Sequence, residues 1–170
     1  MLRTRVIPCL LLKDLGLVKT VKFNDPKYVG DPINAVKIFN EKGVDELIFL
    51  DITATTEKRK PPFELLSRIA SECFMPFSYG GGIRDIEDIR KILEMGAEKI
   101  SLNDYALENP SFIREAADQF GSQSIIVAID VKKNNQGQYE VFSQNGKKGW
   151  EKDPLQWAIG VEKLGAGEIL

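Results

Sequence analysis

Hydrophobic and polar positions along the chain repeat in a strand–helix order. Short apolar runs, of the kind buried on both faces of a parallel sheet, are each followed by an amphipathic stretch. The pattern predicts strands at residues 6–12, 45–51, 74–77, 99–103 and 124–130, with a sixth beginning at 168–170. The helices between them are predicted within 31–43, 63–73 and 85–95, from 109 onward, and within 153–165.

Local signals mark several helix ends. Asp31-Pro32 and Asp153-Pro154 each provide an N-cap carboxylate and a first-turn proline, and we expect the same cap chemistry at Asn109-Pro110. Asp85 is a further N-cap, with an acidic residue at the capping-box position. Residues 13–30 are predicted to form a long irregular loop, and residues 133–148 a small hairpin inserted in another loop.

Strict alternation of strands and helices predicts an α/β fold with a parallel sheet. A weak internal repeat relates 43–48 to 165–170, which indicates two similar halves of a (β/α)8 TIM barrel. We therefore expect one incomplete barrel over residues 1–170, with 1–122 as the first half-barrel and 123–170 as the start of the second. A complete barrel needs ~250 residues, so only about the first five and a half βα units are expected, as in a fragment or truncated product. A flavodoxin-like doubly wound sheet is the alternative.

Composition removes several function classes. The chain has 170 residues, 43% of them hydrophobic, and a net charge of −2, which gives no electrostatic signature of nucleic-acid binding. No apolar run is long enough for a membrane span and no signal peptide is evident, so we predict a cytoplasmic protein. Cys9 and Cys73 are predicted to be buried thiols. The chain has no histidine, which excludes Ser-His-Asp chemistry and the usual zinc sites, and we expect no metal and no cofactor.

Three consecutive glycines, Gly80, Gly81 and Gly82, join the third strand to the helix that Asp85 opens. A strand, a glycine turn and a helix start present backbone N–H groups to an anion. A tight turn would need only one glycine, so we favour phosphate binding over a purely conformational explanation. The spacing matches no nucleotide-binding motif.

Candidate polar residues lie where the strands end, which is the active-site end of a parallel barrel. Asp130 closes an apolar strand, and we favour a functional role for it over a turn cap. For Asp51 the two explanations are evenly matched. Lys19, in the first loop, is either a phosphate clamp or a solvated lysine. At the opposite ends of the strands stand two cations and two anions, which on the residues alone we interpret as a structural seal: Arg5, Glu46, Lys99 and Glu168.

Several segments together resemble the cyclase subunit of imidazole glycerol phosphate synthase. They are Arg5–Leu10, Gly30–Pro32, Asp45–Thr53, Gly80–Arg84, Gly121–Gln123, Ala128–Asp130 and Gly165–Leu170. The resemblance covers the whole chain and implies a barrel with a glutaminase subunit docked on its floor. Ammonia would pass through the barrel to a phosphorylated small-molecule substrate at the top.

The resemblance also implies residue roles. Gly82 and Asn103, with Gly81 beside them, would bind phosphate, Lys19 and Asp51 would contact substrate, and Asp130 would be one of two catalytic aspartates. It reverses the structural interpretation of the strand-start charges, which would form the gate of the ammonia channel: Arg5, Glu46, Lys99 and Glu168.

The sequence departs from this family at the top of the barrel. Leu11 stands where the second catalytic aspartate is expected, and an apolar side chain cannot transfer a proton. Asp14 is nearby but three residues further on, Tyr28 in the first loop also differs, and Asp104 replaces a small hydroxyl residue beside a presumed phosphate. We therefore favour a paralogue that delivers ammonia for amidation of a surface-polysaccharide sugar. The Leu10–Lys13 segment also resembles the first strand of such paralogues. The alternatives are a histidine-biosynthesis cyclase and a non-catalytic ammonia conduit.

Overall fold

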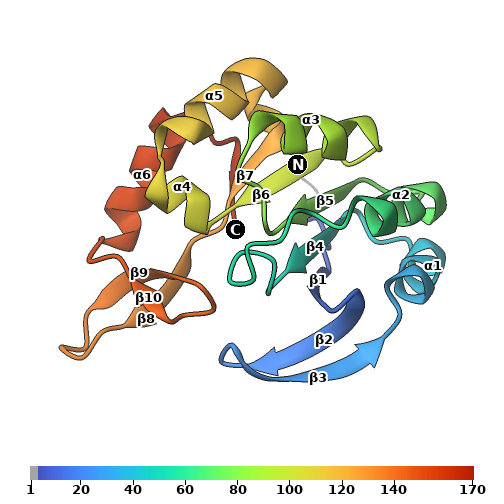
Figure 1. Cartoon of the computed structure of the whole chain (residues 1–170), viewed down its shortest axis with the longest axis horizontal. Coiled ribbons are helices and arrows are strands. Elements are labelled where there is room, and N and C mark those ends of the chain that lie inside the picture. Colours follow the sequence, from blue (N-terminus) through green and yellow to red (C-terminus); the bar gives the residue numbers. More distant parts are fainter. Residues whose placement is uncertain (1–3) are drawn as a thin grey trace.

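The structure, a computed structural model, describes residues 4–170 and contains a curved, mostly parallel sheet covered on its outer side by helices (Figure 1). Six strands run parallel: β1 (Cys9–Lys13), β4 (Leu47–Asp51), β5 (Phe77–Gly80), β6 (Lys99–Leu102), β7 (Ile125–Val127) and β11 (Glu168–Ile169). The helices are α1 (Pro32–Lys42), α2 (Phe63–Glu72), α3 (Ile86–Glu94), α4 (Asp104–Glu108), α5 (Ser111–Phe120) and α6 (Pro154–Lys163). A short 3₁₀ turn, η1 (Ser122–Ser124), precedes β7.

The strand order identifies the fold class. Each parallel strand pairs with the next one along the chain, in the order β11-β7-β6-β5-β4-β1. A doubly wound sheet reverses its strand order at a switch point, whereas a (β/α) barrel adds strands in sequence. The predicted barrel-type fold is therefore confirmed, over an open arc of six parallel strands, and the flavodoxin-like alternative is wrong. The assignment of two half-barrels stays a prediction.

The core lies between the sheet and the surrounding helices. Leu47 and Phe49 of β4 are fully buried on the helix side, and Phe49 packs edge-to-face on Phe77 of β5. The helices contribute aliphatic side chains at helical spacing, such as Leu66 and Ile69 of α2. Burial of these apolar side chains holds the helices against the sheet.

The predicted caps form at three helices. Asp31 accepts hydrogen bonds from the N–H groups of Ile33 and Asn34, at 2.9 and 3.1 Å, while Asp85 and Asp153 cap α3 and α6. The expected cap at Asn109 is wrong. Residues 104–108 form the extra helix α4, and the Asn109 side chain accepts a hydrogen bond from Ser111 Oγ while Pro110 precedes α5.

The predicted irregular loop at residues 13–30 is a β-hairpin instead. Strands β2 (Gly16–Val21) and β3 (Asn24–Gly30) extend the sheet beyond β1 in antiparallel orientation. Leu17 is buried in the core, which gives the hairpin an apolar side. Its turn residues Lys22 and Phe23 both have positive φ, as a type I′ turn requires, but neither is the glycine or asparagine by which such turns are recognised.

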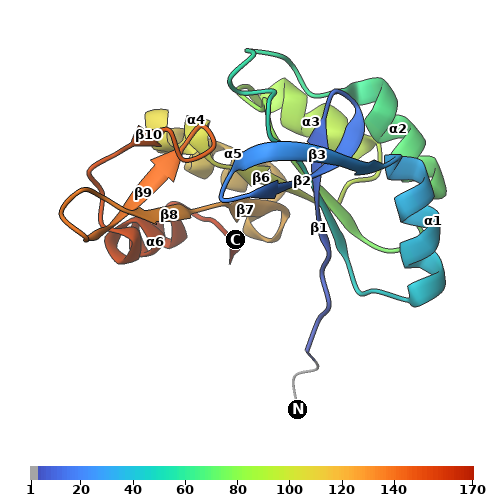
Figure 2. The same cartoon turned by 90° about the horizontal axis from the view of Figure 1, so that it is seen from below.

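The predicted hairpin near residues 133–148 is confirmed and is larger than expected. Strands β8 (Asp130–Lys133), β9 (Tyr139–Ser143) and β10 (Lys148–Gly149) form a separate three-stranded sheet. Asp130 therefore begins β8, and β7 ends at Val127 instead of continuing to 130 as predicted. Figures 1 and 2 both show the tip of the β2–β3 hairpin approaching this small sheet.

Two further findings concern the surface. Cys9 is exposed and Cys73 is half-buried, so the prediction of two buried thiols is wrong. Cys9 and Leu12 are three positions apart on β1, so their side chains point to opposite faces of the sheet. Leu12 faces the core, and Cys9 therefore lies on the inner side, away from the helices. Within residues 4–170, no helix is long and apolar enough to cross a membrane.

Candidate functional site

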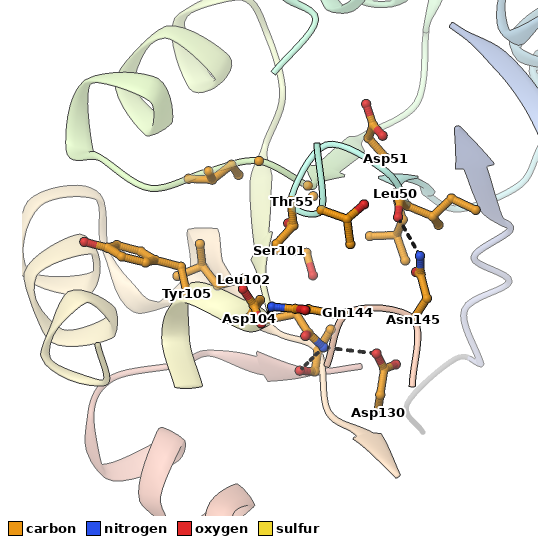
Figure 3. A pocket seen from close by; sticks show the side chains of 18 of the residues that line it. Leu50, Asp51, Thr55, Ser101, Leu102, Asp104, Tyr105, Asp130, Gln144 and Asn145 are labelled. Carbon is orange, nitrogen blue, oxygen red and sulfur yellow. Dashed lines mark hydrogen bonds between the residues drawn. The ribbon is translucent and has the colours of Figure 1, made fainter. Parts of the chain in front are cut away.

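A cavity of about 120 Å³ lies at the carboxyl ends of β4, β5, β6 and β7 (Figure 3). It is smaller than the ~300–1,000 Å³ typical of whole-ligand sites, and its size is that of a site for one ligand group. The lining includes three of the sequence-predicted features, namely Asp51, the glycines with Asn103, and Asp130. The other polar residues of the lining are Thr55, Thr56, Arg84, Ser101, Asp104, Tyr105, Gln144 and Asn145.

Packing alone requires each of the three glycines. A Cβ on Gly80 would lie 2.9 Å from Ser101 O, and one on Gly81 would lie 2.5 Å from Asp51 O. A Cβ on Gly82, where φ is +73°, would lie 2.5 Å from Arg59 O. The argument that a turn needs only one glycine was therefore wrong for this site, and phosphate binding rests on other features.

One such feature is a set of unpaired backbone donors. Within residues 4–170, the N–H groups of Gly82 and Asn103 donate no hydrogen bond to backbone or side chain. Both residues line the cavity, together with Gly81. Buried or half-buried N–H groups are normally paired, so these two are available to an anion or to water. We call Gly81, Gly82 and Asn103 the glycine cradle.

Asp51 organises the loop that follows β4. Its side chain is almost completely buried, and Oδ1 accepts hydrogen bonds from the N–H groups of Thr53 and Ala54 at 3.0 and 2.9 Å. Arg59 donates to both carboxylate oxygens at 3.2 and 3.3 Å. These contacts account for Asp51 as a turn anchor, and its contact with a substrate stays a prediction.

Asp130 lies on the opposite side of the cavity, close to Asn103. Asn103 Nδ2 donates to Ala128 O at 3.1 Å and is 3.4 Å from Asp130 Oδ2. Burial raises the pKa of Asp130, and the hydrogen bond from Asn103 only partly offsets this effect. A carboxyl group with a raised pKa in a cavity is suited to proton transfer, although structural carboxylates also show such shifts.

The small sheet forms one wall of the cavity through Ser143–Gly146. Ser143 Oγ donates to Asp104 Oδ1 at 2.7 Å, and Asn145 Nδ2 donates to Ile52 O at 3.0 Å. Gly146 lies near the ring of Phe23 at the tip of the β2–β3 hairpin. Gln144 and Asn145 were not identified from the sequence. The dipeptide Asn145-Gly146 is a local turn signal, but it does not show what the turn faces.

Three expected residues lie outside the cavity lining. Lys19 is exposed on β2, where it pairs across the hairpin with Lys27. Leu11 is half-buried between Leu50 of β4 and Val18 of β2. Asp14 is exposed in the tight β1–β2 turn and also does not line the cavity. The structure thus does not bring Lys19 to the glycine cradle, and its substrate role stays a prediction.

The four charged residues at the strand starts form a closed ring of ion pairs. Arg5 contacts Glu46 and, at 3.0 Å, Glu168. Lys99 completes the ring through the same two carboxylates, at 3.1 and 3.0 Å. Burial would raise the pKa of Glu168, but hydrogen bonds from Lys99 and Arg5 outweigh this effect and lower it. The predicted ring therefore exists, at the opposite end of the strands from the cavity.

The sequential parallel sheet with a cavity at its carboxyl ends defines a protein of the (β/α) barrel class. The family model described as histidine biosynthesis protein matches residues 5–170, and the chain belongs to this family. A Pseudomonas aeruginosa relative with the provisional name imidazole glycerol phosphate synthase subunit hisF2 is 57% identical over 99% of this chain and 67% of its own length.

Two further relatives are named imidazole glycerol phosphate synthase subunit HisF. The protein of an Exiguobacterium species is 49% identical, and that of Streptococcus sanguinis is 45% identical, each over all of this chain. The matches cover 66% and 68% of those relatives. The chain thus spans about two thirds of the length of the curated relatives it matches.

No group of three or more acidic, cysteine or histidine side chains within residues 4–170 is placed to hold a metal ion. The polar groups that line the cavity include hydrogen-bond donors and acceptors, such as Asn103 and Asp104. The site is therefore suited to binding a polar ligand group beside a carboxyl group capable of proton transfer.

The crowding at Gly82 predicts a large effect of Gly82→Ala on stability. The added methyl group would both clash with Arg59 O and occupy a positive-φ conformation, so we expect a loss of about 2–4 kcal/mol in the free energy of unfolding. Gly137→Ala is the matched control, because φ is +79° there but nothing lies within 4 Å, and about 1 kcal/mol is expected. Urea denaturation measures both, and equal losses would contradict the crowding.

The raised pKa of Asp130 predicts a pH-dependent gain from Asp130→Asn. The folded chain binds this proton more tightly than the unfolded chain, so ionisation at neutral pH lowers the free energy of unfolding. Asp130→Asn should therefore stabilise the chain at pH 7. The gain should shrink as pH falls toward about 3.9, the ordinary carboxyl value. Denaturation at several pH values tests this, with the exposed Asp118→Asn as a control that should show no such gain.

Proposed function

We propose that this chain belongs to an ammonia-channelling synthase subunit of the imidazole glycerol phosphate synthase type. It would receive ammonia from a glutaminase subunit docked at the strand starts and deliver it to the cavity at the strand ends. The observation that carries the proposal is the closed ion-pair ring of Arg5, Glu46, Lys99 and Glu168. The relatives named as HisF subunits support the same assignment.

The composition of the ring supports a gate. Two cations and two anions alternate around it, so it is electrically neutral and would close this end of the sheet to ions. Lys99 and Glu46 are largely buried, whereas the Arg5 side chain is 47% exposed. Exposed ion pairs contribute only ~0–1 kcal/mol, so Arg5 would be the member that moves at least cost to admit a neutral molecule such as ammonia.

At the other end, Asp130 would act as a general acid or base, and the glycine cradle would bind a phosphate group of the substrate. The second expected acid–base group is replaced by Leu11, which packs between β2 and β4. Loss of one such group typically costs ~10²–10⁴ in rate. We therefore favour a paralogue whose ammonia serves a different amidation, that of a surface-polysaccharide sugar. Two relatives carry numbered provisional names, hisF2 at 57% identity and hisF3 of Vibrio vulnificus at 51%, which fits a paralogue and does not identify its acceptor.

A histidine-biosynthesis cyclase is the second candidate. Asp130 and the glycine cradle line one cavity, as that reaction requires, and relatives named HisF without qualification are 45–49% identical. The third candidate is a conduit without chemistry of its own. The position of Asp130 beside Asn103 in the cavity, with its pKa raised by burial, favours the two enzymatic functions.

Substitution at Leu11 separates these functions. In the complete subunit supplied with ammonia, we expect negligible turnover of the cyclase substrate by the unmodified protein. Leu11→Asp should raise turnover by ~10²-fold or more, because it restores a second group for proton transfer. Leu11→Asn is the control, because Asn has nearly the same shape as Asp but cannot transfer a proton, and it should not raise turnover. Unmodified protein as active as Leu11→Asp would instead identify a histidine-pathway enzyme, and inactivity of all three would mean that the acceptor site has changed.

The gate is tested with glutamine as the nitrogen source. In the Leu11→Asp subunit assembled with a glutaminase, adding Lys99→Ala opens the ring and leaves Arg5 to pair with both Glu46 and Glu168. We expect glutamine-dependent turnover to fall at least fivefold while turnover with added ammonia changes less than twofold. Lys42→Ala, an exposed change at the end of α1, is the control. Equal losses with both nitrogen sources would argue for a structural ring only.

A further inference from the structure

The charges around the cavity do not favour an anionic ligand. Among residues 4–170, the carboxylates of Asp51, Asp104 and Asp130 line it together with a single cation, Arg84. Arg59 neutralises Asp51 from outside the lining. Asp104 and Asp130 are left with one guanidinium group between them, although the cavity offers the bare N–H groups of the glycine cradle.

Arg84 is already engaged. Its NH2 group lies 3.5 Å from Asp104 Oδ2 and 3.2 Å from Glu108 Oε2. The guanidinium group also stacks on the Tyr105 ring, 5.3 Å from its centroid. Two carboxylates and an aromatic face therefore hold the cation that a phosphate in the cradle would otherwise recruit.

Asp104 cannot easily turn away from the cavity. The residue is 4% exposed, and Oδ1 accepts hydrogen bonds from Ser143 Oγ at 2.7 Å and Gln144 Nε2 at 3.4 Å. Ser143 Oγ is itself fixed, because it accepts a hydrogen bond from Trp150 Nε1 at 2.8 Å. The carboxylate is thus held next to Asn103 of the cradle by a chain of hydrogen bonds from the small sheet.

We infer that Asp104 is a specificity-determining residue that weakens binding of a phosphate dianion in the glycine cradle. It acts in two ways, by placing a fixed negative charge beside the cradle and by retaining Arg84. The cradle accordingly binds a phosphate group more weakly than it would with a neutral residue at position 104. The inference rests on the proposed function only in taking the cradle as the ligand-binding site.

Inorganic phosphate at pH 8.5, where it is a dianion, is the probe. Isothermal titration of the intact chain should show at least tenfold tighter binding to Asp104→Asn than to the unmodified protein. The amide oxygen can still accept the Ser143 hydrogen bond, so the wall of the cavity is retained while the charge is removed. Adding Arg84→Gln to Asp104→Asn should reverse most of the gain. Asp104→Ser provides a second neutral variant if the amide disturbs folding.

Asp118→Asn is the matched control, since it makes the same change in net charge at an exposed site on α5 and should leave phosphate binding unchanged. Equal affinity for the unmodified protein and both neutral variants would overturn the inference. So would the absence of phosphate binding in all of them, which would show that the cradle is no phosphate site. Neither result affects the glutamine and ammonia assays, which judge the proposed function separately.

Discussion

The close approach of the β5–α3 loop to the β4 loop is the constraint on which the cavity depends. Gly81 and Gly82 lie against the backbone of Asp51 and Arg59 with no room for a side chain. Asp51 in turn fixes the β4 loop through a half-buried ion pair with Arg59 and through hydrogen bonds that its side chain accepts from the N–H groups of Thr53 and Ala54. The Gly82 N–H, which donates no hydrogen bond within residues 4–170, belongs to the same crowded loop, so the glycine that the packing requires also offers a backbone donor.

The two ends of the parallel strands are electrostatically different. At the strand starts, four charges neutralise one another in a closed ring, which resembles a sealed layer more than a binding site. At the strand ends, carboxylates outnumber cations, and the burial of Asp130 raises its pKa.

The small sheet inserted after β7 is part of the cavity and not a separate appendage. Its Ser143–Gly146 segment contacts the α4 start, the β4 loop and the tip of the β2–β3 hairpin. Asp104 accepts a hydrogen bond from Ser143 of this wall and also forms an ion pair with Arg84. One buried carboxylate therefore affects both the shape and the charge of the cavity. The departures from the cyclase pattern, Leu11 and Asp104, both lie at this end of the strands, whereas the ring at the other end is complete.

The order of the six parallel strands and of five of the helices could be predicted from the sequence, because apolar periodicity and caps such as Asp31-Pro32 are local features. The sequence also identified the four residues of the ring and the candidates Asp51, Asn103 and Asp130, since the ends of parallel strands meet at one edge. Tertiary structure alone decided the rest. The β2–β3 hairpin forms through burial of Leu17, although its turn contains no glycine. Asn109 does not cap α5 because it ends the extra helix α4. The three glycines are required by neighbours far apart in sequence. Likewise, the placement of Gln144 and Asn145 in the cavity depends on long-range hydrogen bonds, which no local pattern records.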